Sequence, residues 1–135
     1  MDQAFIIAVD DDFDSLEIIR HALESGGYRV ETFLDPMPAL ERMREQKPDL
    51  VITDLMMKQI DSGLSFSRLI TFDPRWRGVP IILVTSAVRS RGLMVQVRSP
   101  ETLAQMGISA YFDKPVPPVE LLKKVAELLA ARGGA

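Results

Sequence analysis

Five short apolar segments, separated by longer and more polar stretches, are the strongest constraint on how this chain can fold. They occupy residues 4–9, 28–33, 50–53, 79–84 and 108–112. Most are rich in Ile, Val, Leu or Phe, and short apolar runs bounded by turn-forming residues are typical of buried strands. Buried strands that alternate with helices form parallel sheets, so the pattern predicts an α/β fold with a parallel five-stranded sheet.

The stretches between these segments predict helices. We expect them at residues 14–26, 36–46, 64–70, 100–106 and 117–132, with an irregular stretch at 86–99. Asp12 or Asp14 is expected to cap the first helix. In three of the helices, apolar residues recur at helical spacing and are expected to face the sheet. These are Leu16, Ile19 and Leu23 in the first, Met37, Leu40 and Met43 in the second, and Val119, Leu122, Val125 and Leu129 in the last.

Polar side chains stand where four of the predicted strands end. Asp10 and Asp11 come after the first strand, Asp54 after the third, Thr85 after the fourth and Lys114 shortly after the fifth. The carboxyl ends of parallel strands share one edge of the sheet, and ligands bind at that edge in open α/β folds. We therefore expect these residues, which are far apart in the sequence, to meet at one site.

Three carboxylates, a hydroxyl and an ammonium at one site indicate a divalent cation and a phosphoryl group. Clustered carboxylates repel one another, and a hard cation such as Mg²⁺, with Mn²⁺ as the alternative, relieves that repulsion through oxygen ligands. The backbone carbonyl of Met56 is a further candidate ligand. Asp54 is the candidate nucleophile, because carboxylates form aspartyl-phosphates, and Lys114 and Thr85 are expected to contact phosphoryl oxygens. A phosphate that draws these two residues toward it would act as a switch.

The composition narrows the class of protein. The chain has 135 residues, 47% of them apolar and 26% charged, which is typical of one globular domain. It has no cysteine for disulfides or thiolate sites, and its single histidine, His21, excludes a histidine metal cluster. A net charge of −3 argues against a nucleic-acid partner, and no apolar stretch approaches the roughly 20 residues of a membrane span. We expect a single cytoplasmic domain, residues 1–135, without an effector domain.

Four segments of the chain resemble the motifs of one family in the same order. They are FIIAVDDDFD, PDLVITDLMM, PIILVTSA and AYFDKPV. Together they resemble the receiver domain of response regulators in two-component signalling, from the first strand to the last helix. The resemblance implies a flavodoxin-like, doubly wound sheet of five parallel strands in the order 2-1-3-4-5, with five helices. It also implies that Asp10 and Asp11 bind the metal and that Asp54 is the phosphorylated residue.

By the same resemblance, Thr85 is the switch hydroxyl and Lys114 the lysine of the phosphorylation site. Tyr111 matches an aromatic switch residue that turns inward on activation, and the Lys114–Pro115 peptide bond is expected to be cis. Such a phosphoprotein receives its phosphoryl group from a histidine kinase or a histidine phosphotransfer protein and then signals to a downstream protein. We expect a monomer or weak dimer, either a stand-alone regulator or a receiver from a hybrid kinase. It would catalyse its own phosphorylation and dephosphorylation without being a conventional enzyme.

Two loops depart from the family pattern. After Asp54, the dipeptide Lys58-Gln59 stands where the family usually has Pro-Gly, and one residue is inserted before the following glycine. The interval from Thr85 to Lys114 is several residues longer than usual, with the extra length in residues 88–98. In the family this region contributes to the signalling face, so we expect an altered output surface.

Two other functions are weighed against the receiver. One is a phosphorylation-independent interaction module on the same fold, although Asp54, Lys114 and the acidic pair are all present. The other is a metal-dependent phosphatase with an aspartate nucleophile. It is disfavoured because such sites typically need a second acid two residues after the nucleophile, where this chain has Met56.

An arginine-rich stretch has two interpretations of its own. Between Phe72 and Pro100 there are five arginines and a single acid, Asp73. A solvated loop face is favoured, and the alternative is a docking patch for an acidic partner, with Trp76 as its anchor. If Trp76 is no anchor, we expect it to pack over the edge of the third helix.

Overall fold

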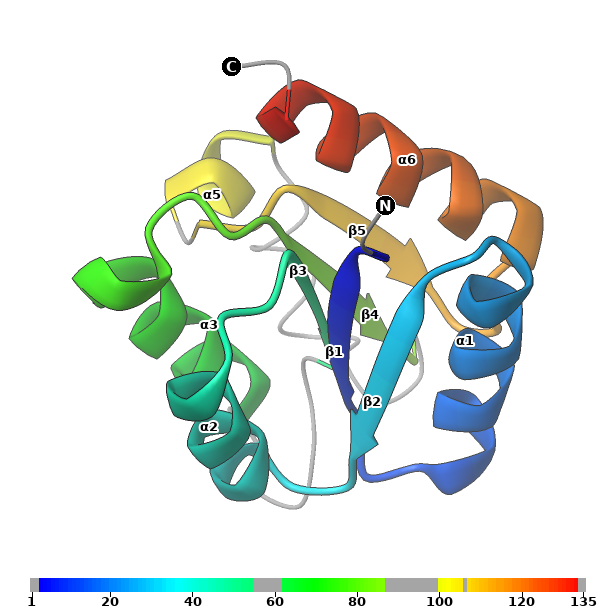
Figure 1. Ribbon diagram of the computed structural model, residues 1–135, viewed down its shortest axis with the longest axis horizontal. Helices are drawn as coiled ribbons and strands as arrows, with labels where there is room; N and C mark the ends of the chain where they lie inside the picture. The colour runs from blue at the N-terminus through cyan, green and yellow to red at the C-terminus, as the bar shows by residue number, and fades with distance from the viewer. Residues whose placement is uncertain (1–2, 55–61, 87–99, 106, 134–135) are drawn as a thin grey trace.

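The computed structural model describes residues 3–54, 62–86, 100–105 and 107–133. Within these ranges five parallel strands form one sheet in the order β2-β1-β3-β4-β5, which confirms the predicted fold class and strand order (Figure 1). The strands are β1 (Phe5–Val9), β2 (Arg29–Phe33), β3 (Leu50–Asp54), β4 (Ile81–Thr85) and β5 (Ala110–Asp113). In the register of the sheet, Ile6 of β1 lies between Val30 of β2 and Leu50 of β3.

Helices cover both faces of this sheet, as Figure 1 shows. The helices are α1 (Phe13–Ser25), α2 (Pro36–Glu45), α3 (Ser62–Phe72), the short 3-10 helix η1 (Pro74–Trp76), α5 (Pro100–Gln105) and α6 (Pro118–Gly133). Buried side chains of α1 and α6 form one core layer, and those of α2 and α3, with a side chain of α5 packed against them, form the other. None of the helices in these ranges is long and apolar enough to cross a bilayer.

The strand sequences follow from this two-sided burial. Along β1, Phe5, Ile7 and Val9 point into the layer of α2 and α3, whereas Ile6 and Ala8 point toward α1 and α6. The central strands β1, β3 and β4 are buried at every residue, and the edge strands β2 and β5 are mostly half-buried. Central strands therefore carry continuous apolar runs, and edge strands carry mixed sequences.

Aspartates define where several helices begin. The Asp12 side chain accepts hydrogen bonds from the backbone N–H groups of Asp14 and Ser15 and so caps α1. Asp35 caps α2 in the same way, directly before Pro36 at the first helical position. Asp12 or Asp14 was expected to cap the first helix, and the cap is Asp12.

The helical faces differ from the predicted ones at two positions. Val119 and Met37 are 70% and 59% exposed, although both were expected to face the sheet. Each lies two residues before a residue that is buried, Leu121 in α6 and Ala39 in α2. Two residues correspond to about 200° around an α-helix, so the two sites face opposite ways. The apolar stripe was predicted correctly in α1, where Leu16, Ile19 and Leu23 are all buried.

Trp76 lies inside the core, in the same buried cluster as Phe66 and Ile70 of α3, so the interpretation of Trp76 as an exposed docking anchor is wrong. Its side chain is 3% exposed, and its indole N–H donates a hydrogen bond to the carbonyl of Met43 in α2, with an N–O distance of 3.3 Å. A buried indole needs such a partner for its polar edge. Trp76 therefore fixes η1 against α2 and is not exposed as a docking anchor. Residues 88–98 and the loop of Met56, Lys58 and Gln59 lie outside the described residues.

Two glycines with positive φ provide a matched test of packing at the turn between α5 and β5. Gly107 and Gly78 have φ values of 75° and 85°. A Cβ atom on Gly107 would overlap the Thr71 side chain, whereas one on Gly78 would meet no atom within 4 Å. Gly78→Ala should lower the free energy of unfolding by about 1–2 kcal/mol through backbone strain alone. Gly107→Ala should lower the free energy of unfolding by roughly 1–3 kcal/mol more than Gly78→Ala does, because its Cβ is also overpacked against Thr71.

Urea unfolding of both variants, followed by circular dichroism, measures the difference. Equal losses in the two variants would show that the approach of Thr71 to Gly107 contributes nothing to stability.

Candidate functional site

The carboxyl edge of the sheet brings together the polar residues that the sequence singled out. Asp10 directly follows β1, Asp54 and Thr85 are the last residues of β3 and β4, and Lys114 directly follows β5. The Asp10 N–H donates a hydrogen bond to the carbonyl of Phe33 at 3.0 Å, which continues the pairing of β1 with β2 beyond the end of β1. With Asp11, which follows Asp10, five side chains from four chain segments therefore reach one edge.

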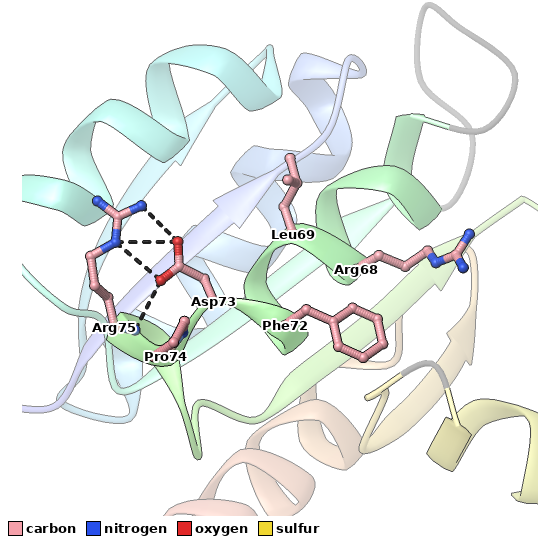
Figure 2. Close-up of a pocket in the computed structure, with 6 residues that line it drawn as sticks. All are labelled: Arg68, Leu69, Phe72, Asp73, Pro74 and Arg75. Carbon is pink, nitrogen blue, oxygen red and sulfur yellow. Dashed lines mark hydrogen bonds and ion pairs between the residues drawn. The ribbon is translucent and has the colours of Figure 1, made fainter.

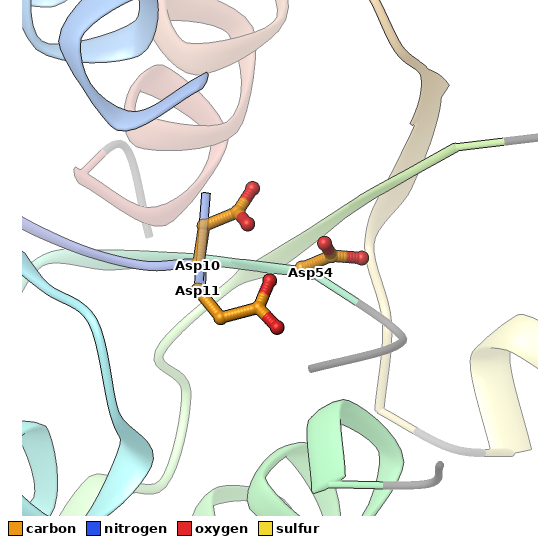
Figure 3. A group of neighbouring side chains, drawn as sticks. All are labelled: Asp10, Asp11 and Asp54. Carbon is orange, nitrogen blue, oxygen red and sulfur yellow. The ribbon is translucent and has the colours of Figure 1, made fainter. Parts of the chain in front are cut away.

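Three carboxylates form the centre of this edge. Oxygen atoms of Asp10, Asp11 and Asp54 all lie within 4.8 Å of one another, and Figure 3 shows the three carboxylates gathered at the ends of their strands. Asp10 and Asp54 are 0% and 1% exposed, whereas Asp11 is only half-buried. We call these three residues the acid cluster. One of its carboxylates remains accessible from solvent.

Lys114 joins the two buried carboxylates. Its Nζ atom lies 2.7 Å from Oδ2 of Asp10 and 2.9 Å from Oδ2 of Asp54, and its side chain is 13% exposed. Burial by itself lowers the pKa of Lys114, but the hydrogen bonds and charges of Asp10 and Asp54 outweigh burial and raise this pKa above its usual value. The ammonium group is therefore charged at physiological pH.

For the pKa of Asp10, by contrast, burial outweighs the interactions with Lys114. The pKa of this carboxyl is raised from 3.8 to about 7: burial is the main cause and the nearby Asp54 charge adds to it, while the hydrogen bond from Lys114 opposes both. A single ammonium therefore does not compensate the buried negative charge. When all three carboxylates are ionised, they and the single ammonium of Lys114 leave two uncompensated negative charges.

This excess charge and the ligand chemistry fit a hard divalent cation. The donors are all carboxylate oxygens, which Mg²⁺ prefers, and few protein ligands suit a cation that keeps several of its waters. A dication would cancel the two remaining charges. The carbonyl of Met56, which was expected to add a ligand, lies outside the described residues.

Thr85 presents a hydroxyl with an unused bonding capacity. The residue is fully buried, and its Oγ1 has no hydrogen-bond partner among the residues that the structure describes. Its carbonyl accepts a hydrogen bond from the Lys114 N–H at 2.8 Å, so the backbones of the two residues are joined. An unsatisfied buried hydroxyl costs about 1–3 kcal/mol. Thr85 is therefore poised to bond a group that enters the site.

Tyr111 and the peptide bond before Pro115 complete the predicted set. Tyr111 is half-buried on β5, packs against the layer of α2 and α3, and donates a hydrogen bond from its hydroxyl to the carboxylate of Asp113. The Lys114–Pro115 peptide bond is cis. The sequence analysis missed Asp113, because nothing in its spacing distinguishes it from an ordinary exposed strand-end residue.

A second missed feature is a small hollow beside Lys114. It has a volume of about 300 Å³ and combines the start of α1 with the segments after β4 and β5. Its lining residues are Asp12, Ser15, Ile18, Ser86, Lys114, Pro115 and Val116. No sequence motif marks it, because three separate segments create its shape.

Comparison with known proteins identifies the family. Residues 6–126 match the model of the response regulator receiver domain. The chain belongs to the receiver domain family. This receiver is therefore a domain of two-component signalling, and its acid cluster lies at the edge of the sheet where the resemblance placed the phosphorylation site.

Individual relatives agree with this assignment. The polar-differentiation response regulator DivK of Brucella anthropi is 29% identical over 82% of this receiver and 84% of DivK. The response regulator PleD of Caulobacter vibrioides is 30% identical over 93% of this receiver, which spans 26% of PleD. Among solved structures, chemotaxis protein CheY4 of Vibrio cholerae has a TM-score of 0.78 at 26% identity, covering 94% of this receiver and 99% of CheY4.

The raised pKa of Asp10 makes the stability of the metal-free receiver depend on pH. An acid with a higher pKa in the folded state binds more protons when folded. The free energy of unfolding should therefore fall as the pH rises from about 4 to about 7 and level off above that range. In Asp10→Asn most of this fall should disappear, and the variant should gain stability relative to the wild type as the pH increases.

Urea unfolding in EDTA at several pH values between 4.5 and 8 measures this effect. Asp14→Asn, at an exposed position in α1, is the matched control and should keep the wild-type slope. The same slope in Asp10→Asn would contradict the assignment of the shift to Asp10.

Proposed function

We propose that this receiver accepts a phosphoryl group on Asp54 from a phosphohistidine of a histidine kinase or histidine phosphotransfer protein. The observation that carries the proposal is the contact of one lysine with two buried carboxylates of the acid cluster. Lys114 lies 2.9 Å from Asp54 and 2.7 Å from Asp10. An ammonium beside the candidate nucleophile supplies positive charge where phosphoryl oxygens would gather.

In the proposed reaction, a carboxylate oxygen of Asp54 attacks the phosphorus atom. A P–O bond forms, the P–N bond to the donor imidazole breaks, and that nitrogen takes up a proton as it leaves. Lys114 would move its ammonium from the Asp54 carboxylate to a phosphoryl oxygen. The hollow beside Lys114 offers space for the donor side chain, because it opens next to the same ammonium.

A divalent cation fits the acid cluster, with Asp10, Asp11 and Asp54 as ligands and the Met56 carbonyl as a further candidate. When bound, Mg²⁺ neutralises charge on the oxygens of the transferring group. Asp10 and Asp11 would hold it, and Asp54 would supply both a ligand oxygen and the attacking oxygen. Mn²⁺ has the same ligand preference and is the alternative cation.

The phosphorylated state would be read out through Thr85 and Tyr111. A phosphate on Asp54 offers new acceptors to the Thr85 hydroxyl, which is buried and without a hydrogen-bond partner among the described residues. Movement of Thr85 toward the phosphate would free space on the Tyr111 side and favour the inward orientation of that ring. We further propose that residues 1–135 act as one cytoplasmic receiver domain, as a monomer or weak dimer, toward a downstream protein.

Phosphorylation of Asp54 can be tested with a small donor. Incubation with acetyl phosphate and Mg²⁺ should add one phosphoryl group to the wild type in an intact-mass measurement. The addition should vanish in Asp54→Asn and in EDTA, and it should fall at least roughly tenfold in rate in Lys114→Ala, which removes the positive charge.

The control is Asp14→Asn, which should be phosphorylated like the wild type. Some receivers do not react with small donors, so binding of beryllofluoride and Mg²⁺ is measured in parallel. Failure of both would favour the phosphorylation-independent interaction module.

Binding of the cation predicts a stability change that does not require phosphorylation. Mg²⁺ at ~100 times its dissociation constant should raise the free energy of unfolding by about 2.7 kcal/mol, because it binds only the folded state. Asp11→Asn should remove most of this gain, since Asp11 is the solvent-accessible ligand of the acid cluster. Thermal unfolding with increasing Mg²⁺ measures the effect. An equal gain in wild type and Asp11→Asn would exclude Asp11 as a ligand.

A further inference from the structure

A second hollow lies at the edge of the sheet opposite to the acid cluster. It has a volume of about 720 Å³ and is formed by the C-terminal end of α3 and by η1. Because η1 leads into the first residues of β4, this surface lies far from the strand ends that carry Asp54 and Thr85. Figure 2 shows its lining residues, which are Arg68, Leu69, Phe72, Asp73, Pro74 and Arg75. We call this surface the α3 hollow.

Two large apolar side chains are exposed in the α3 hollow. Leu69 and Phe72 are 55% and 70% exposed, and with Pro74 they make the hollow predominantly apolar. Single exposed apolar residues are common, but Leu69 and Phe72 border one open hollow, where a partner side chain could contact both. Arg75 in turn covers the buried Trp76, because its guanidinium lies 4.7 Å from the centre of the indole ring.

The rim of the α3 hollow is positively charged. Arg68 is exposed and has no ion pair within the described residues. Arg75 pairs with Asp73 at 2.6 Å, and the hydrogen bonds from Arg75 lower the pKa of Asp73, so the two opposite charges offset each other and Arg68 supplies the excess positive charge. The charge of Arg44 also acts on Asp73, and the Lys47 ammonium donates to the Arg77 carbonyl at 3.2 Å. Three further cations, Arg44, Lys47 and Arg77, therefore lie near the hollow.

We propose that the α3 hollow binds an acidic peptide segment of another protein, with an apolar side chain of that segment seated between Leu69 and Phe72. Carboxylates of the segment would pair with Arg68 and with the outer face of Arg75. Apolar anchors with a charged rim are the usual anatomy of protein recognition sites. Charge complementarity favours this occupant, because the basic rim attracts carboxylates.

Two other occupants fit the charges less well. An isologous contact between two copies would bring the same arginine-rich rim against itself, which is unfavourable. An anionic membrane is disfavoured because two exposed apolar side chains provide little area for insertion. The proposal goes beyond the phosphorylation site, because no residue of the acid cluster takes part in it.

The test is a selection from a random-peptide display library on the full chain. We expect enriched peptides to combine acidic residues with at least one large apolar residue. Synthetic copies, measured by fluorescence anisotropy, should bind the double variant Arg68→Glu/Phe72→Ser at least roughly tenfold more weakly than the wild type. The matched control is Lys123→Glu/Val119→Ser on α6, which makes the same kinds of change at two other exposed positions and should bind like the wild type.

All four of these positions are exposed, and circular dichroism and thermal unfolding check that both double variants are folded. The affinity of the peptides should fall with added salt, since surface charge attraction is screened. Enrichment of peptides without acidic residues, or equal binding to both double variants, would overturn the proposal. Loss of binding to phosphatidylserine vesicles or of self-association in Arg68→Glu/Phe72→Ser would instead assign the surface to a membrane or a second copy.

This experiment is independent of the proposed phosphoryl transfer. Asp54→Asn should keep full peptide binding, and Arg68→Glu/Phe72→Ser should keep the reaction with acetyl phosphate. A receiver that is not phosphorylated could therefore still bind the peptide, and a receiver that does not bind the peptide could still be phosphorylated.

Discussion

The candidate site depends on one ammonium group that lies between two buried carboxylates. Lys114 contacts Asp10 after β1 and Asp54 at the end of β3, and it is itself anchored to β4 through the Thr85 carbonyl. Removing one partner from a buried charge network leaves an uncompensated charge, which typically costs about 3–5 kcal/mol. The ammonium of Lys114 therefore holds four strand ends together. If Lys114 moves away, another positive charge must take its place beside Asp10 and Asp54.

The topology explains why these charges meet. In the order β2-β1-β3-β4-β5, β1 and β3 are neighbours although α1, β2 and α2 separate them in the sequence. Parallel strands end at one edge, so an acid after each of these two strands is enough to build a pair of carboxylates. The opposite edge holds the chain reversals from helix to strand. There the end of α3 and η1 leave Leu69 and Phe72 exposed, and a surface forms that shares no residue with the acid cluster.

Sequence reasoning succeeded where a pattern repeats and failed where a single contact decides. Repeated apolar runs and the acids at their ends predicted the strand order, through the family resemblance, and the meeting of Asp10, Asp11 and Asp54. The hydrogen bond of the Trp76 indole to α2 could not be predicted, since it depends on the position of the Met43 carbonyl. The exposure of Val119 depends on the rotation of α6 about its own axis. The Tyr111–Asp113 hydrogen bond and both hollows arise from side-chain placement, which leaves no periodic signal.

The different states of Thr85 and Lys114 indicate where the energy of the proposed switch would come from. Lys114 already has two carboxylate partners, so a phosphoryl oxygen would replace one acceptor with another for little net gain. The Thr85 hydroxyl has no hydrogen-bond partner within the described residues, and a new bond would recover the cost of about 1–3 kcal/mol that an unsatisfied buried hydroxyl carries. A coupling of that size corresponds to a change in partner affinity of roughly 5- to 150-fold. Because the Lys114 N–H donates to the Thr85 carbonyl, a displacement of Thr85 would also move the segment after β5 that carries Lys114.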